Sequence, residues 1–291
     1  MVEALHVVWH VLWHALLDTL TVLPFLFLTY LLMEFLEHHA GDRAMAIIKR
    51  AGRGGPAIGA VLGLLPQCGF SAAAAGLYAG RVVTVGTLLA VFLSTSDEMI
   101  AVFLGTGLSA RVVLTTLAVK LTVAMPVGFF ADLLLRRRVG DMEVADLCEE
   151  EGCHCERGIW RSALHHTLHI AAFVLIVNIA LGAVLESVGA ERLAAWLGGV
   201  PVLSQCVAAL VGLIPNCAAS VAVATLYARG VLSAGAMLAG LFTGAGAGLL
   251  VLFRVNKRVK ENLLLVGALF LISVCFGCLL DYTGFAAFIG L

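Results

Sequence analysis

Long apolar runs separated by short polar segments dominate this chain. Six of the runs have the length, about 20 residues, with which a helix crosses the ~30 Å hydrocarbon core of a bilayer. They lie near residues 15–36, 82–106, 111–135, 162–186, 231–253 and 262–283. The pattern predicts an all-α integral membrane protein. Its expected location is the bacterial inner (plasma) membrane, which the chain would cross several times.

Two further apolar runs each contain Pro, an amide residue and Cys in succession. The first reads GLLPQCGFSAAAAGLYAG over residues 63–80, and the second reads GLIPNCAASVAVATLYARG over residues 212–230. Proline lacks a backbone donor and disrupts a helix interior, and Gln and Asn are polar, so the triplet is unfavourable inside a continuous lipid-facing helix. We therefore expect the runs 56–79 and 201–228 to turn at their triplets.

The two triplets belong to an internal repeat of roughly 140 residues. A constant offset of 149 residues aligns Pro66 with Pro215, Cys68 with Cys217, Ser71 with Ser220, Tyr78 with Tyr227, Gly86 with Gly235, Gly128 with Gly277 and Asp132 with Asp281. Self-similarity of this kind indicates a duplicated structural unit. The predicted organisation is a first transmembrane repeat (1–138), a cytoplasmic Cys- and Glu-rich linker (139–160) and a second transmembrane repeat (161–291).

The distribution of Lys and Arg predicts how the triplet runs enter the membrane. If each run crossed once, with the amino terminus outside, 10 basic residues would lie inside and 7 outside. If each run instead enters and returns as a hairpin, 14 lie inside and 3 outside, with Lys120 within a span. The hairpin arrangement agrees better with the positive-inside rule. It gives each half three crossing helices and a broken or re-entrant hairpin, so the second half is inverted relative to the first.

Composition and charge narrow the function. The chain is 61% hydrophobic and 13% charged, against about 25% charged in soluble domains. A net charge of −1 gives no electrostatic reason to expect a nucleic-acid partner. Inverted repeats with broken elements at the midplane are typical of secondary transporters. Because no Walker sequence is present, we expect a transporter driven by an ion gradient or by the membrane potential, with no enzymatic activity and no cofactor other than a transported metal ion.

Four segments also carry a resemblance to a known family. GLLPQCGFSAAAAGLYAGR, TLLAVFLSTSDE, DTLTVLPFLFLTYLLMEFLEH and GLIPNCAAS resemble the ten-transmembrane heavy-metal exporter family, whose members are labelled arsenic efflux proteins or manganese transporters. The resemblance covers nearly the whole chain except residues 139–158. It implies ten spans, in agreement with three crossings and a two-armed hairpin per half. It also implies export of a heavy-metal or metalloid species such as manganese or arsenite.

The predicted cargo site lies between the two hairpin tips. It comprises Gln67, Cys68, Ser71, Asn216, Cys217 and Ser220, together with Ser94, Ser96, Asp97 and Glu98 of the STSDE segment. Cys68 and Cys217 would offer a soft thiolate from each half to a metal or to trivalent arsenic, although cysteines can equally fill tight turns as small apolar residues. The amides and the helix ends beyond the tips favour an anion. Export of a small organic or inorganic anion therefore remains the alternative.

Charged residues within the predicted spans are candidates for coupling. Asp97 and Glu98 lie about ten residues, or ~15 Å, from the outer end of their span, and Lys120 lies at a similar depth in the next span. Intramembrane charges mark functional sites, so the acidic pair is predicted to bind metal or couple an ion; a structural ion pair with Lys120 is the alternative. Asp18 and His166, which align in the repeat, are further coupling candidates.

Two cysteine-containing segments offer other chemistry. The linker sequence CEEEGCHCE could hold an accessory metal through Cys148, Cys153, His154 and Cys155, or it could be merely acidic. Cys275 and Cys278 form Cys-x-x-Cys within the last span, which leaves a membrane thiol oxidoreductase as a remote alternative function. The expected partners are the lipid bilayer and the metal or small-anion cargo, and a homodimer is left open.

Overall fold

The computed structural model of the chain describes residues 9, 12–17, 19–20, 23–24, 26–28, 30–31, 54–66, 68–96, 99–135, 159–188 and 202–284. These residues form helices joined by short turns, with no β-strand among them. Five helical stretches are long and apolar enough to cross a membrane: Val85–Gly105, Ala110–Leu135, Ala163–Ala180, Ala234–Val255 and Val259–Tyr282. They match five of the six predicted crossing runs. The sixth, residues 15–36, lies partly outside the described residues.

The helices of the two halves follow the same order. The first half contains α3 (Gly55–Gly63), α4 (Cys68–Ala79), α5 (Val85–Ser94), α6 (Met99–Gly105) and α7 (Ala110–Leu135). The second contains α9 (Ile159–Val188), α11 (Leu203–Gly212), α12 (Cys217–Ala228), α13 (Ala234–Thr243), α14 (Ala247–Val255) and α15 (Val259–Tyr282). The offset of 149 residues superimposes the bounds of α4 on those of α12 and of α5 on those of α13, and the other pairs agree within two residues. The sequence repeat thus extends to the order and lengths of the helices.

Each predicted turn at a triplet is present. The turn after α3 contains Pro66, and the turn after α11 contains Pro215. The four helices beside these turns have 9 to 12 residues, fewer than the roughly 20 needed to cross the hydrocarbon core. Asn216 begins α12 as its N-cap, because its Oδ1 accepts a hydrogen bond of 2.8 Å from the N–H of Ala218.

The stretches Val85–Gly105 and Ala234–Val255 are both interrupted near their middle. The first is divided because α5 ends at Ser94 and α6 begins at Met99, so the predicted run 82–106 is not one continuous helix. The second is divided at residues 244–246, although the apolar run 231–253 predicted a continuous helix. Gly246 explains this difference, because its φ of +53° lies in a region that glycine enters at little cost.

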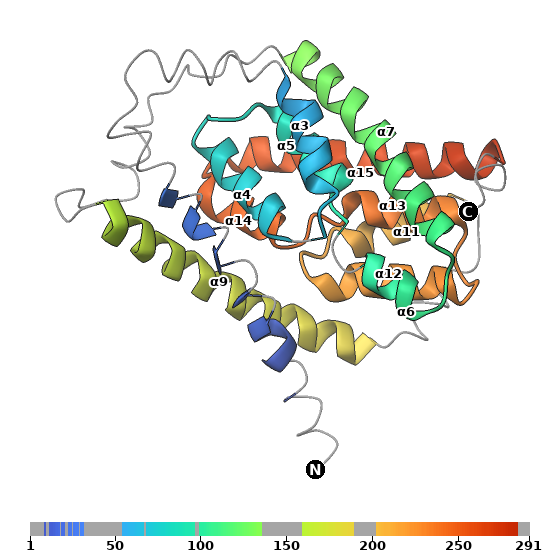
Figure 1. The fold of residues 1–291 in the computed structure, drawn as a ribbon, viewed down its shortest axis with the longest axis horizontal. Helices are drawn as coiled ribbons and strands as arrows, with labels where there is room; N and C mark the ends of the chain where they lie inside the picture. The colour runs from blue at the N-terminus through green and yellow to red at the C-terminus, as the bar shows by residue number, and fades with distance from the viewer. Residues whose placement is uncertain are drawn as a thin grey trace.

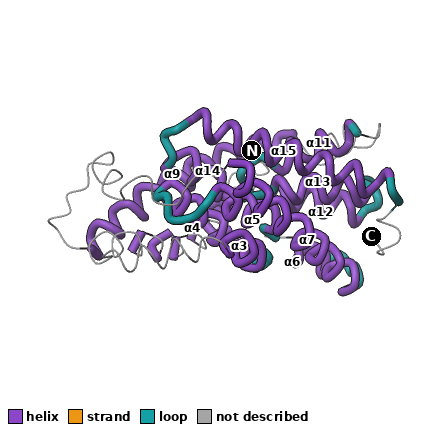
Figure 2. The backbone as a smooth tube through the Cα atoms, turned by 90° about the horizontal axis from the view of Figure 1, so that it is seen from above, coloured by secondary structure: helices purple, strands orange, loops and turns teal. Residues whose placement is uncertain are grey.

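The core lies around α5 and α13, in which every residue is buried. Within each half this central helix packs between two others, α5 between α3 and α7, and α13 between α11 and α15. Between the halves, α4 lies beside α14, α12 lies beside α6, and α5 contacts α13 (Figures 1 and 2). Each half therefore contributes one short helix to the packing of the other.

Large apolar side chains remain exposed on the long outer helices. Leu114, Phe130 and Leu133 of α7, Ile176 of α9 and Leu264 of α15 are each at least 60% exposed. A soluble monomer rarely exposes so much apolar surface. The exposure and the five long apolar helices are compatible with a multi-pass membrane protein.

Candidate functional site

Two turns between helices and two breaks within long helical stretches lie close together. We call this region the junction: the turns that follow α3 and α11, the break between α5 and α6, the break between α13 and α14, and Lys120. A Cβ at Gly63, at the end of α3, would contact Ser94 at the end of α5. A Cβ at Gly212, at the end of α11, would likewise contact Thr243 at the end of α13. Each turn therefore lies against the break of its own half.

The helices that follow the turns also lie against the second break. A Cβ at Gly248, in the first turn of α14, would lie 2.7 Å from the Cβ of Ser71, in the first turn of α4. A Cβ at Gly244 would lie 3.0 Å from Oγ of Ser220, in the first turn of α12. Ser71 and Ser220 are both buried. The structure thus brings these two predicted site residues, one from each half, to the same break.

Lys120 joins the breaks of the two halves. Its side chain is 0% exposed, and Nζ donates hydrogen bonds to the carbonyl of Thr95, the C-cap of α5, and to the carbonyl of Leu241 in α13, the latter at 2.9 Å. In a continuous helix the Leu241 carbonyl would accept from the N–H of Ala245, but that N–H bonds the Thr243 carbonyl at 2.8 Å. The break at 244–246 therefore frees a carbonyl, and the ammonium of Lys120 satisfies it.

The hydroxyl groups at the first break bond the backbone. Ser94 Oγ and Thr95 Oγ1 both donate to the Val91 carbonyl, at 3.1 and 2.7 Å, and Ser96 Oγ donates to the Ser94 carbonyl at 2.9 Å. All three residues are buried. In this conformation, Ser94 and Ser96 of the predicted cargo site help to satisfy the carbonyl groups at the end of α5.

The turn after α11 is hydrogen-bonded to α9 at Asn178, a residue that the sequence did not predict for the site. Asn216 is 7% exposed, and its Nδ2 donates to the backbone carbonyl of Asn178 at 3.3 Å. The side chain of Asn178 is also buried, and its Oδ1 has no hydrogen-bond partner among the described residues. The only sequence signal for this residue was an isolated amide in the apolar run 162–186. Cys217, the first residue of α12, is half-buried.

Several predicted site residues lie outside the described residues: Gln67, Asp97, Glu98, Asp18, Cys148, Cys153, His154 and Cys155. The backbones of Cys68 in α4 and His166 in α9 are described, but their side chains are not. All four predicted metal ligands, Cys68, Cys217, Asp97 and Glu98, therefore stay predictions. Within the described part of the chain, no three His, Cys, Asp or Glu side chains gather closely enough to hold a metal. Cys275 and Cys278 of α15 are free thiols.

An acidic residue anchors the start of each central helix. Asp132 of α7 accepts hydrogen bonds from the N–H of Gly86 at 2.7 Å and from Thr84 Oγ1 at 2.8 Å. Asp281 of α15 accepts equivalent bonds from the N–H of Gly235 at 2.8 Å and from Ser233 Oγ at 2.5 Å. A carboxylate at a helix N-terminus complements the helix dipole. The aligned pair of acids in the sequence thus has a structural role at the far ends of α5 and α13.

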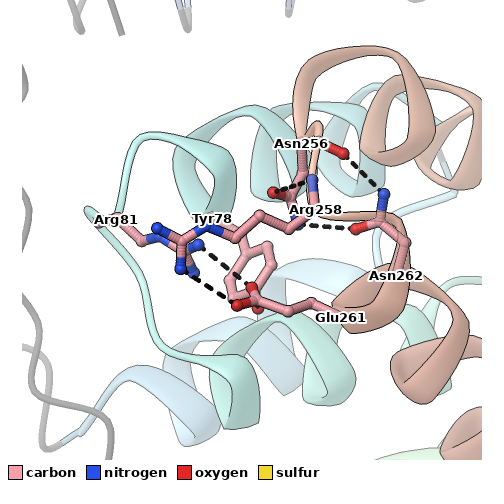
Figure 3. Close-up of polar contacts among 6 residues, drawn as sticks. All are labelled: Tyr78, Arg81, Asn256, Arg258, Glu261 and Asn262. Atoms are coloured by element: carbon pink, nitrogen blue, oxygen red, sulfur yellow. Dashed lines mark hydrogen bonds and ion pairs between the residues drawn. The ribbon is translucent and has the colours of Figure 1, made fainter. Parts of the chain in front are cut away.

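A polar cluster joins the two halves (Figure 3). The carboxylate of Glu261 in α15 accepts from Nη2 of Arg81 at 3.1 Å, from the hydroxyl of Tyr78 at 3.5 Å and from Nη1 of Arg258 at 3.2 Å. Beside it, Nδ2 of Asn256 donates to Oδ1 of Asn262 at 2.7 Å. Tyr78 and Arg81 belong to the first half and the other residues to the second.

Comparison with protein-family models, curated proteins and solved structures found no match for this chain. The resemblance to the heavy-metal exporter family accordingly rests on the quoted sequence segments, and the function must be argued from the junction.

Proposed function

We propose that this chain is a secondary active membrane transporter that holds its cargo at the junction of two inverted halves. The observation that carries the proposal is the exchange of helices: α4 packs on α14, and α12 packs on α6. Lys120 adds a direct connection, because it bonds carbonyl groups of both α5 and α13. Broken helices that meet between two repeats are the construction from which secondary transporters form a central site.

Three contacts support the proposed hairpins. They are the ion pair of Arg81 with Glu261, the hydrogen bond of 2.5 Å between Arg254 and His169, and the ring contact between Phe103 and Tyr227 with centroids 5.8 Å apart. If the triplet runs crossed the membrane once, each contact would join residues from opposite sides. With hairpins, the first two contacts lie on the inside and the third on the outside. The hairpin arrangement in turn requires the second half to be inverted.

The proposed cargo is a heavy-metal or metalloid species, exported from the cell, as the sequence resemblance implies. The described candidate ligand is the half-buried thiol of Cys217, because soft ions prefer thiolate ligands. A small anion is the second candidate. It is favoured by the N-terminus of α12, where the helix dipole attracts negative charge, and by the ammonium of Lys120 at the junction.

Transport by the purified full chain in proteoliposomes tests the proposal. We expect efflux of at least one member of a panel of manganese, zinc, cadmium, arsenite and small organic acids, driven by a pH gradient or a membrane potential. Protein-free vesicles and the variant Leu264→Ala, changed at a side chain 66% exposed on α15, serve as controls. Folded protein that moves no member of the panel faster than empty vesicles would contradict the proposal.

A second pair of variants separates the two classes of cargo. For a soft metal, Cys68→Ser with Cys217→Ser should abolish binding, because hydroxyl groups are poor ligands for soft ions. For an anion, the same variant should keep most of its affinity, while Gln67→Leu with Asn216→Leu should lose it. If neither variant changes affinity by tenfold, about 1.4 kcal/mol, the turns do not form the cargo site.

A further inference from the structure

The surroundings of Lys120 have the chemistry of a cation site. Two carbonyls that accept from its ammonium, those of Thr95 and Leu241, belong to the ends of α5 and α13, where helix breaks occur. Carbonyl oxygens at the C-terminal ends of half-helices and in unwound backbone are the groups that coordinate coupling cations such as Na⁺ in broken-helix transporters. They carry the negative end of the helix dipole. Here an amino-acid side chain already supplies the positive charge.

Only one half provides this charge. The repeat places Leu269 of α15 at the position equivalent to Lys120, and Leu269 is also buried, at 1% exposed. A single ammonium therefore bonds the ends of both central helices. The carbonyl of Leu241 lacks its helical donor, because the N–H of Ala245 bonds the carbonyl of Thr243 instead, and the ammonium takes the place of that donor.

We propose that Lys120 is a tethered cation that occupies, at the junction, the place of an inorganic coupling cation. Bound there, the ammonium holds the ends of α5 and α13 together and makes the junction independent of Na⁺ and of other small monovalent cations. Removal of the side chain should leave a carbonyl-lined site that takes a free cation instead. This inference rests on the proposed transport function. Its test, however, measures protein stability and requires no cargo, so the tethered-cation proposal and the transport proposal can fail separately.

The test uses the variant Lys120→Ala of the full chain, purified in detergent. Its thermal midpoint is measured in N-methyl-D-glucamine chloride, which is too large to enter, and then with increasing NaCl, LiCl, KCl or propylammonium chloride at constant ionic strength. Propylammonium reproduces the atoms that the substitution removes. We expect a lower midpoint than in the wild type, and a saturable rise with propylammonium or with at least one of the inorganic cations, as for any ligand that binds only the folded state.

Leu269→Ala is the matched control, because it truncates the equivalent buried side chain of the other half. Its midpoint should fall through loss of packing, but it should not respond to any of the cations. The variant Lys120→Met, which keeps most of the volume without the charge, should be less stable than the wild type and should also not respond, because its side chain fills the space.

Three results would overturn the proposal. The first is a wild-type midpoint that rises saturably with Na⁺, Li⁺ or K⁺, and this measurement decides the question even if Lys120→Ala fails to fold. The second is a Lys120→Met variant as stable as the wild type. The third is a folded Lys120→Ala variant that responds no more than Leu269→Ala to every cation tested.

Discussion

Asn216 shows how one amide can serve two neighbours at the junction. Its Oδ1 caps α12, while its Nδ2 bonds the Asn178 carbonyl of α9. Asn216→Ala should therefore lose about 1 kcal/mol through the cap alone, plus the loss of the bond to α9. Asn216→Asp keeps the capping oxygen and loses only the donor. Thermal midpoints of the two variants should fall in the order wild type, Asp, Ala, and equal losses for Asp and Ala would contradict a role for the cap.

Glu261 is the residue on which the polar cluster between the halves depends. It is 17% exposed and pairs with both Arg81 and Arg258. Because ion pairs near water are partly screened, we expect Glu261→Gln to destabilise the protein by only about 1 kcal/mol at low salt, and less at high salt. Lys260→Gln, on the exposed neighbouring residue, should have almost no effect. A loss that does not change with salt would mean that packing, rather than charge, accounts for the role of Glu261.

The sequence predicted the identity of several of these residues but not their partners. Lys120 was recognisable as a charge within an apolar run, and the structure buries it in α7. Its carbonyl acceptors could not be predicted, because they depend on which backbone groups a break releases and on how the two halves meet. Asn178 was missed because a single Asn in a long apolar run gives little indication of whether it faces a neighbour.

At the scale of the helices, close backbone contact defines both halves. A Cβ at Gly86 would collide with the carbonyl of Gly128 and lie 2.5 Å from the Asp132 carboxylate, and a Cβ at Gly235 would meet Gly277 and Asp281 in the same way. Because these contacts involve the backbone and a hydrogen-bonded carboxylate, moving either helix to make room would cost free energy.

Gly86→Ala and Gly235→Ala should therefore each cost at least about 2 kcal/mol and lower the thermal midpoint. A Cβ at Gly267, in the middle of α15, would have open space around it, with no described atom of another element within 4 Å. Gly267→Ala should instead raise stability by up to about 1 kcal/mol, because alanine restricts the unfolded chain and favours a helix. A Gly86→Ala variant as stable as Gly267→Ala would show that α5 and α7 do not pack this closely.

The apolar runs predicted where most long helical stretches lie, and proline predicted a turn at each triplet; the structure has these stretches and these turns. The break at residues 244–246 could not be predicted from hydropathy, because Gly and Ala keep the run apolar and hydropathy does not report backbone dihedral angles. The polar STSDE residues lie where α5 ends, whereas the second break lies at the aligned TGAGAG, which has no charged residue.

At the scale of the molecule, the important feature is the exchange of short helices between halves. The pairing of α4 with α14 and of α12 with α6 joins residues more than 100 positions apart, and no local pattern predicts it. Two contacts between the halves differ in chemistry. Glu261 pairs with Arg81 as ions, whereas the rings of Phe103 and Tyr227 contact each other. In the proposed transporter, these contacts would have to separate in turn when access alternates.

The position of each loop relative to the membrane is the strongest test of this arrangement. Single cysteines placed at Val83 and Ser109 in a Cys-free background distinguish the alternatives, because hairpins put residue 83 inside and residue 109 outside, whereas single crossings reverse both. Both residues are at least partly exposed, so a membrane-impermeant maleimide can reach either one from its own side. We expect labelling of intact cells at Ser109 and at Arg229, and labelling at Val83 and Lys257 only after permeabilisation.

The background itself needs a control, because eight native cysteines must be replaced and two of them belong to the predicted cargo site. Size-exclusion behaviour and the thermal midpoint of the Cys-free protein should match those of the wild type before labelling is interpreted. Labelling of Val83 in intact cells, with Ser109 silent, would place Arg81 and Glu261 on opposite sides of the bilayer. Such a result is incompatible with their ion pair of 3.1 Å, so the same experiment tests the hairpins, the inversion of the second half and the exchange of helices on which the proposed junction depends.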